Sequence, residues 1–284
     1  MPELPEVETI RRELEPLLPG KTFARPVLHM PTTIGHPSPE LFAAGLEGQG
    51  VEKVRRRGKY LIINLNRGIM VVHLRMTGNL IYSASGSLDD DRFLRVTMPF
   101  CDGSALFFLD MRRFGRLWLL RDEEEMNRIV LRNVGPDYYT EISRGDFVEK
   151  LGQKERSRLK ALLLDQGFAA GMGNIYTDEC LFRCSLHPET RVSTLCREKR
   201  GELYDAIQEV LKQGIEHGGT SFRDYRSASG ALGDFQSRLK VYGRKDENCR
   251  CGGTICKTTV AGRGTYYCSC CQAVSEEGEE DEVK

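Results

Sequence analysis

The sequence lacks the features of membrane, collagenous and wholly disordered proteins. Its 284 residues contain no apolar run near the roughly 20 residues that a membrane helix needs. The opening MPELPEVETI is acidic and contains proline, so we expect no secretory signal there. Hydrophobic residues make up 40% and charged residues 29%, which is typical of a soluble globular chain. The length favours two domains over one.

The chain also lacks net charge, and this alone argues against a nucleic-acid-binding protein. Its 41 basic residues balance 41 acidic ones. The balance depends on the last ten residues, 275–284, which hold six acids and one lysine. The remainder has 40 basic and 35 acidic residues and is therefore mildly basic. The acidic run is typical of a disordered, solubilising tail, and the basic body permits DNA binding.

Hydrophobic periodicity divides the chain into successive regions. Apolar residues at helical spacing predict an amphipathic helix over residues 3–17. Short alternating runs such as YLIINL and RLWLL predict a β-sandwich or barrel, and later runs such as NIYTDECLF predict helices. We expect a β domain at 1–134, a linker at 135–146, a helical domain at 147–240, a cysteine-rich hairpin at 241–273 and a disordered tail at 274–284.

The first residues offer a candidate nucleophile. Met1 precedes Pro2, a small residue after which the initiator methionine is normally removed. The amine of the mature Pro2 would titrate near ~7.7–8.0 and be partly neutral at pH 7. Such an amine attacks electrophilic carbon to form a Schiff base, and the adjacent Glu3 can carry protons. Taken alone, however, Pro-Glu is better interpreted as an ordinary helix start.

Six of the ten cysteines lie within residues 249–271. Without a secretory signal, clustered thiols favour a metal site over disulfides or unliganded thiols. We predict one structural zinc ion, held tetrahedrally by Cys249, Cys251, Cys268 and Cys271. The first pair has one intervening residue where two are usual, so Cys256 and Cys270 remain alternative ligands.

Several further motifs suit nucleic acid. GMGNIY (171–176) places two glycines before a helix, which suits an anion site or a simple helix–helix turn. Met76 and Phe114 lie in HLRMTG and DMRRFG, where a Met, an Arg and a Phe can fill the gap left by an extruded base. From spacing alone, both are better interpreted as core residues. Arg263 lies between the cysteine pairs and suits either phosphate contact or a solvated basic face.

The order of these motifs resembles the bacterial formamidopyrimidine-DNA glycosylase family. The matching segments are MPELPEVETIRR, RRRGKYL, HLRMTG, DMRRFG, GMGNIYTDECLF and VYGRK before the cysteine pairs, and they cover residues 1–272. PELPEVE is more similar to this family than to its endonuclease-VIII-type branch. The resemblance implies an α+β fold, with an N-terminal β-sandwich and flanking helices, then a helical helix–two-turn–helix domain and a zinc ribbon.

The resemblance also implies the chemistry of a bifunctional DNA glycosylase and AP lyase in base excision repair. Duplex DNA with an oxidised purine, such as 8-oxoguanine or a formamidopyrimidine, would bind between the domains. Pro2 would attack the sugar C1′ and expel the base, with Glu3 as proton carrier. Lys59 matches the lysine of β-elimination, and Arg263 matches the arginine of δ-elimination.

The remaining family positions imply contacts with DNA. Met76, Arg113 and Phe114 match the trio that enters the helix when the lesion flips out. The other matching positions are His73, Lys154, Lys160, Asn174 and Tyr242. Asp234 stands where the family usually has tyrosine, in the loop of base recognition. Two alternatives therefore stay open: the same lyase with oxidised-pyrimidine preference, and a non-catalytic DNA-binding zinc protein. We expect a monomer in the bacterial cytoplasm, at the nucleoid, with no membrane partner.

Overall fold

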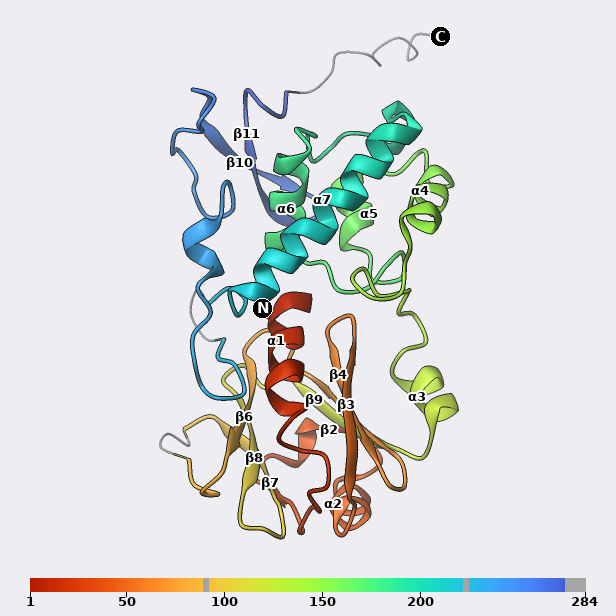
Figure 1. Cartoon of the computed structure of the whole chain (residues 1–284), viewed down its shortest axis with the longest axis vertical. Coiled ribbons are helices and arrows are strands. Elements are labelled where there is room, and N and C mark those ends of the chain that lie inside the picture. The colour runs from red at the N-terminus through yellow and green to blue at the C-terminus, as the bar shows by residue number, and fades with distance from the viewer. Residues whose placement is uncertain (89–91, 222–224, 274–284) are drawn as a thin grey trace. The chain divides into compact units, whose positions relative to one another are not determined.

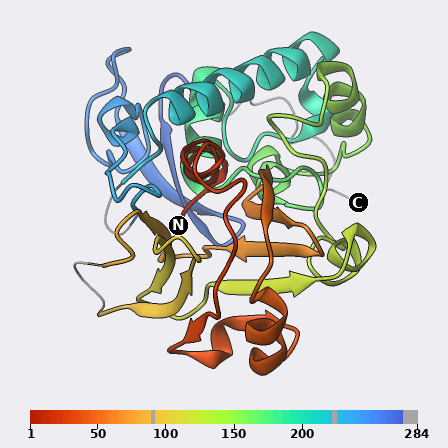
Figure 2. The ribbon, with the colours of Figure 1, turned by 60° about the horizontal axis from the view of Figure 1, so that its bottom comes forward.

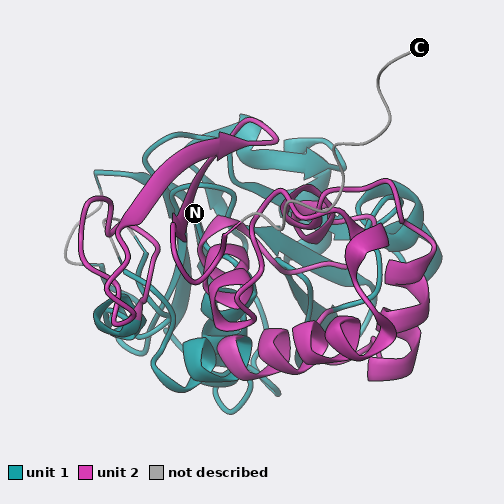
Figure 3. Cartoon of the chain, turned by 90° about the horizontal axis from the view of Figure 1, so that it is seen from above, with its two compact units in different colours: residues 1–137, 211–238 teal, residues 138–210, 239–284 magenta. Residues whose placement is uncertain are grey.

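The computed structural model describes residues 1–88, 92–221 and 225–273. The predicted acidic tail, 274–284, lies outside these residues. The chain divides into two compact units, coloured in Figure 3: unit 1 is residues 1–137 with 211–238, and unit 2 is residues 138–210 with 239–284. Residues 211–238, which the sequence placed in the helical domain, thus cluster with unit 1.

Unit 1 is built on two β-sheets. Its strands are β1 (Val27–Leu28), β2 (Ile34–His36), β3 (Val51–Arg57), β4 (Tyr60–Leu65), β5 (Ile69–His73), β6 (Gly78–Ser83), β7 (Leu94–Pro99), β8 (Ala105–Asp110) and β9 (Arg116–Leu120). One sheet has the order β1-β7-β8-β6 and the other β2-β9-β5-β4-β3. Neighbouring strands are antiparallel except β2 and β9, which are parallel.

The core of unit 1 lies between these sheets, because alternate side chains of each strand point inward. Ile63 and Val72 come from one sheet, and Val96 and Phe108 come from the other. This arrangement confirms the predicted β-sandwich. The helices and 3-10 turns around it are α1 (Leu4–Leu14), η1 (Pro31–Thr33), α2 (Pro39–Leu46), α3 (Glu123–Ile129) and η3 (Phe235–Arg238).

Helix α1 closes part of this core and carries the N-terminal residues. It buries the apolar stripe of Val7, Ile10 and Leu14 in the same cluster as the sheets. Figure 1 shows α1 in red beside the β3–β4 hairpin, and Figure 2 shows α2 at the margin of the unit, beside β2. The predicted helix at 3–17 is therefore confirmed, one turn shorter at its C-terminal end.

Unit 2 combines helices with a C-terminal hairpin. Its elements are α4 (Arg144–Gly152), α5 (Leu159–Leu164), α6 (Asn174–Arg183), η2 (Val192–Thr194), β10 (Ile255–Val260) and β11 (Arg263–Cys268), and α7 (Arg197–Glu216) begins in this unit. Strand β11 packs on α6, and Phe182 shares a small core with Val241 and Ile255. The predicted α+β class, with a helical region and a C-terminal hairpin, is confirmed. Within the described residues, every helix is too short or too polar to cross a membrane.

Candidate functional site

The N-terminal residues of unit 1 are held by a carboxylate. Pro2 and Glu3 are both buried where α1 begins. The backbone N–H of Glu3 donates to Oε2 of Glu6 at 2.7 Å, which is half of a capping box. The other oxygen of Glu6 accepts the N–H of Thr220 at 2.7 Å, and the Tyr225 hydroxyl donates to the Glu6 carbonyl at 3.1 Å. Glu6 therefore fixes the start of α1 against the 211–238 segment.

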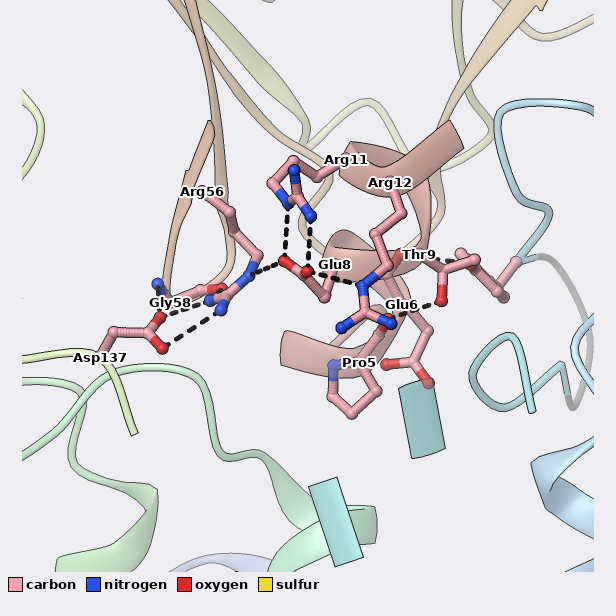
Figure 4. A network of polar contacts seen from close by, with 10 residues as sticks. Pro5, Glu6, Glu8, Thr9, Arg11, Arg12, Arg56, Gly58 and Asp137 are labelled. Atoms are coloured by element: carbon pink, nitrogen blue, oxygen red, sulfur yellow. Dashed lines mark hydrogen bonds and ion pairs between the residues drawn. The ribbon is translucent and has the colours of Figure 1, made fainter. Parts of the chain in front are cut away.

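A buried charge network, drawn in Figure 4, joins α1 to the turn between β3 and β4. The side chain of Arg56 is 1% exposed and contacts two carboxylates, those of Glu8 on α1 and Asp137. Its Nε lies 3.0 Å from Glu8, and its Nη1 donates to Asp137 and to the Gly58 carbonyl. Asp137 also accepts the Gly58 N–H at 2.6 Å. One guanidinium thus holds α1, the β3–β4 turn and residue 137 together.

This network positions a candidate catalytic lysine. Lys59 directly follows Gly58, whose φ of +56° belongs to the left-handed region that favours glycine. Lys59 is 7% exposed. Burial acts to raise the pKa of Glu8, but the Arg11 hydrogen bond and the Arg56 charge outweigh it and lower that pKa to about 2. Glu8 therefore stays ionised and keeps α1 tied to the turn that carries Lys59.

His73 on β5 is a neutral imidazole. Burial lowers its pKa to about 3, and the charges of Arg75 and Lys59 act in the same direction. Its Nδ1 accepts the N–H of Arg75 at 3.0 Å, so the ring proton is on Nε2. The phosphate contact predicted for His73 would therefore be a neutral N–H donation.

The three residues of the predicted insertion trio lie on two exposed loops. Met76 is 40% exposed and Phe114 is 49% exposed, and Arg113 is exposed with a φ of +63°. Buried Asp110 joins the two loops: its Oδ1 accepts from the Thr77 hydroxyl at 2.5 Å, and its Oδ2 accepts from the Gly115 N–H at 2.7 Å. Their exposure excludes the core interpretation of Met76 and Phe114.

The residues of unit 2 that are predicted to contact DNA differ in their exposure and in their partners. Lys154 and Arg263 are exposed, and Arg263 is the first residue of β11. The Asn174 amide donates to the Gly264 carbonyl at 2.7 Å. Tyr242 is half-buried against the ring of Tyr266, with centroids 5.1 Å apart.

Lys160 is fully buried, which the sequence did not predict. Both Lys160 and Asp178 have 0% side-chain exposure, and Nζ lies 2.5 Å from Oδ1. Nζ also donates to the Gly264 carbonyl at 3.4 Å. The ammonium group is thus enclosed by protein, and the DNA contact expected from the resemblance stays a prediction.

The four predicted metal ligands come together in space. The sulfur atoms of Cys249, Cys251, Cys268 and Cys271 all lie within 4.8 Å of one another, and this group, among the described residues, does not include Cys256 or Cys270. The Sγ–Sγ distance is 3.8 Å for Cys249–Cys271 and 3.5 Å for Cys251–Cys268. A tetrahedral zinc with bonds of about 2.3 Å needs sulfur atoms about 3.8 Å apart, so the thiols fit this ion.

Cys249 and Cys251 lie in a tight turn, in which the Cys249 N–H donates to the Gly253 carbonyl at 2.8 Å and the Gly252 N–H donates to the Cys249 carbonyl at 2.9 Å. The Gly253 N–H donates to Sγ of Cys251 at 3.4 Å, and the Cys271 N–H donates to Sγ of Cys268 at 3.4 Å. The Gly253 hydrogen bond, with those of neighbouring thiols, lowers the pKa of Cys251 to about 6, which favours the thiolate that binds metal. A Cβ on Gly253 would lie 2.5 Å from Cβ of Cys270, so only glycine fits this close approach.

Comparison with known proteins decides the family. The model of the formamidopyrimidine-DNA glycosylase N-terminal domain matches residues 1–117, and that of the H2TH domain of the same enzymes matches residues 134–226. The chain belongs to the formamidopyrimidine-DNA glycosylase family. It is 42% identical over 276 residues to the formamidopyrimidine-DNA glycosylase of Pelotomaculum thermopropionicum, covering 96% of this chain and 100% of that one. With its Bacillus cereus counterpart it shares 39% identity over 274 residues, covering 96% and 99%.

Solved structures of the family have the same fold. A Lactococcus lactis Fpg variant bound to Fapy-dG-containing DNA has a TM-score of 0.87 at 36% identity, covering 96% of this chain and 100% of that one. The Lactococcus lactis Fpg bound to abasic-site DNA has a TM-score of 0.86 at 35% identity, with the same coverage. This family membership identifies the chain as a DNA-binding glycosylase of DNA repair with a cysteine cluster suited to zinc.

Sequence reasoning missed the residues that hold the candidate catalytic and DNA-binding side chains in place. Glu6 and Glu8 lie in the PELPEVE segment, and Asp110 directly precedes MRRFG, so proximity to a motif was a usable signal for them. Asp178 lies in GMGNIYTDECLF and offered the same signal, whereas Asp137 carries none, because its partner Arg56 is 81 residues away in the sequence.

Proposed function

We propose that this chain is a bifunctional DNA glycosylase and AP lyase that removes oxidised purines, such as 8-oxoguanine and formamidopyrimidines, from duplex DNA. The observation that carries the proposal is the Glu8–Arg56–Asp137 network. It ties the helix that begins with Pro2 and Glu3 to the turn that holds Lys59. An amine, a carboxylate and a lysine are the groups that Schiff-base chemistry requires.

In the proposed reaction, removal of Met1 frees the secondary amine of Pro2. Its nitrogen bonds to C1′ as the glycosidic bond breaks, and the base leaves with a proton. Glu3 carries protons during ring opening to the imine. The imine makes the C2′ protons acidic, and Lys59 assists the loss of the 3′ phosphate. Arg263 binds phosphate and assists the subsequent loss of the 5′ phosphate, so one intermediate serves both activities.

The exposed loops of unit 1 suit base extrusion. Met76 and Phe114 would replace the flipped nucleotide in the stack, and Arg113 would pair with the orphaned cytosine. Lys154, Asn174, His73 and Tyr242 would contact the DNA backbone. We also propose that the chain acts as a monomer in the cytoplasm, at the nucleoid, since its relatives are bacterial. Light scattering that gives the mass of two chains would contradict the monomer.

We further propose that the cysteine cluster holds one structural zinc ion. Cys249, Cys251, Cys268 and Cys271 would bind it as thiolates. The ion would fix the base of the β10–β11 hairpin, which carries Arg263, and would take no part in the chemical steps.

The experiment is borohydride trapping on duplexes that contain 8-oxoguanine opposite cytosine. We expect a covalent adduct and strand cleavage with the wild type. An uncleaved N-terminal extension converts the Pro2 nitrogen to an amide and should abolish both, whereas the same extension at the C-terminus should change neither. An undiminished adduct in the N-terminally extended protein would refute the assigned nucleophile.

The substrate is tested on a second duplex, which carries an oxidised pyrimidine. Faster excision of that base would overturn the purine preference and leave the lyase chemistry intact. Specific binding without any adduct on either duplex would identify a non-catalytic DNA-binding protein.

A further inference from the structure

The outer edge of β11 is satisfied by side chains. In the β10–β11 pair, alternate residues of β11 direct their backbone groups away from β10. The Gly264 carbonyl accepts from Asn174, the Tyr266 N–H donates to Oδ2 of Asp178 at 2.9 Å, and the Cys268 N–H donates to Gln272 at 2.9 Å. Side chains therefore replace a third strand along this edge.

Lys160 and Asp178 contribute opposite charges to this edge. Lys160 lies on α5 and directs Nζ to the Gly264 carbonyl, and Asp178 lies on α6 and accepts the Tyr266 N–H. A slip of β11 by one residue would turn these two backbone groups toward β10. The pair would stay bonded to each other, but it would lose its hydrogen bonds to the β11 backbone, and unmade hydrogen bonds of buried charged groups are costly. The pair is therefore complementary to one register of the hairpin.

The Lys160–Asp178 pair contacts β11 near the tip of the hairpin, and the cysteine cluster lies at the base of the hairpin. Arg263 directly precedes Gly264 and follows the turn at Ala261 and Gly262, both of which have positive φ. Cys268 lies four residues beyond Gly264, which is about 13 Å along an extended strand. A metal ion at the cysteines lies far from the tip, where the Lys160–Asp178 pair and Asn174 hold β11 beside Arg263.

We propose that Lys160 and Asp178 are positioning residues that fix the register and direction of β11 so that Arg263 is presented to the DNA phosphate. Lys160 acts through the hairpin and makes no DNA contact of its own. This inference rests on the proposed lyase function and assigns to Lys160 a role other than the one expected from the family resemblance.

The test uses Lys160→Met, the double variant Lys160→Met/Asp178→Leu, and, as the control, Lys199→Met, which removes a half-buried lysine of the same unit that pairs with Glu202. Single-turnover reactions on a preformed abasic site give the rate of trappable adduct and the ratio of β,δ- to β-elimination products. We expect both Lys160 variants to lower this ratio about tenfold with adduct formation changed less than about twofold. Lys199→Met should match the wild type.

The double variant keeps the test informative where the single variant folds poorly, because removing both charges leaves no unpaired ion. Adding Arg263→Ala to either Lys160 variant should lower the product ratio no further, since the residues act in one unit. A wild-type ratio in the double variant with full metal content would overturn the proposal. So would an unchanged ratio together with a salt dependence of binding reduced by about one phosphate contact, which would identify Lys160 as a direct DNA ligand.

A second measurement does not depend on catalysis. The Tyr266 amide should exchange with deuterium faster in the double variant than in the wild type, while the Cys268 amide keeps its protection. Equal protection of the Tyr266 amide in both proteins would contradict the positioning role of Lys160 and Asp178, even if strand cleavage is also absent. Absence of any trapped adduct with the wild type would instead refute the lyase function, so the two failures are distinguishable.

Discussion

The two units each bury a charged group, but they hold it with different kinds of side chain. In unit 1, the Arg56 guanidinium contacts two carboxylates and a carbonyl. In unit 2, the Lys160 ammonium contacts the Asp178 carboxylate and the Gly264 carbonyl. The planar fork of arginine suits several fixed acceptors, whereas lysine offers a single point charge. The Arg56 network therefore holds separate elements rigidly. In the Lys160–Asp178 pair, the cost of burying the charges comes closer to the gain from pairing them.

The pKa values of the two acids reflect this difference. The Arg11 hydrogen bond and the Arg56 charge outweigh burial and lower the pKa of Glu8 to about 2. Burial outweighs the attraction of Lys160 and raises the pKa of Asp178 to about 7. The charge network of unit 1 is thus permanent at physiological pH, and that of unit 2 lies near its titration point.

The largest expected effect is the response of unit 2 to metal removal. A strong chelator should unfold the β10–β11 hairpin, because structural zinc supplies much of the folding energy of small cysteine sites. The lone tryptophan, Trp118 on β9, should show an unchanged unfolding transition for unit 1. Purified protein should contain one equivalent of zinc, retained in Cys256→Ser and lost in Cys268→Ser. Zinc that is retained in Cys268→Ser would contradict the ligand assignment.

Removal of the Arg56 charge should be the next largest effect. Arg56→Met removes the guanidinium that buried Asp137 shares with Glu8, while Glu8 keeps Arg11 and Arg12, and it should cost about 3–5 kcal/mol of unfolding free energy. Urea denaturation followed by Trp118 fluorescence measures this change in unit 1. Arg25→Met removes an exposed pair with Glu47 and should cost less than about 1 kcal/mol. Equal losses for the two variants would remove the distinction between the buried network and an exposed pair.

The smallest effect is a pH dependence confined to unit 2. The folded-state pKa of Asp178 is raised above its unfolded value of 3.8 to about 7. The folded state therefore binds the extra proton, and this stabilising contribution is full below pH 3.8 and lost as pH rises through about 7. Unfolding of unit 2, followed by circular dichroism, should become easier between pH 5 and 8 by on the order of 2 kcal/mol. Asp178→Asn should flatten this pH dependence. A wild-type unfolding free energy that rises with pH over this range, while that of Asp178→Asn stays flat, would contradict the raised pKa of Asp178.

The sequence predicted the strands that coincide with short apolar runs. Strands β4 and β9 begin and end where their apolar runs do. Strand β3 was not predicted, because VEKVRRR reads as a charged surface segment although Arg56 is buried in it. Helices α2 and α3 were not predicted either, since both are short and one is dominated by acidic residues.

For the candidate site too, the sequence predicted what depends on local residues and missed what depends on distant ones. The cysteine spacing predicted the four thiols that lie together in the structure, because local turns determine their geometry. Arg56 and Lys160 both read as surface cations, since the acids that bury them lie elsewhere in the chain. Whether a cation faces solvent or an internal carboxylate depends on tertiary packing, which residue type and local spacing do not encode.

The central claim, that the amine of Pro2 is the nucleophile, is tested most directly by peptide mapping of the borohydride-reduced adduct. Tandem mass spectrometry of the wild-type protein, trapped on 8-oxoguanine duplex DNA, should place the reduced sugar remnant on the nitrogen of Pro2, with Met1 absent. A remnant on Lys59 or any other amine, with Pro2 unmodified, would contradict the account.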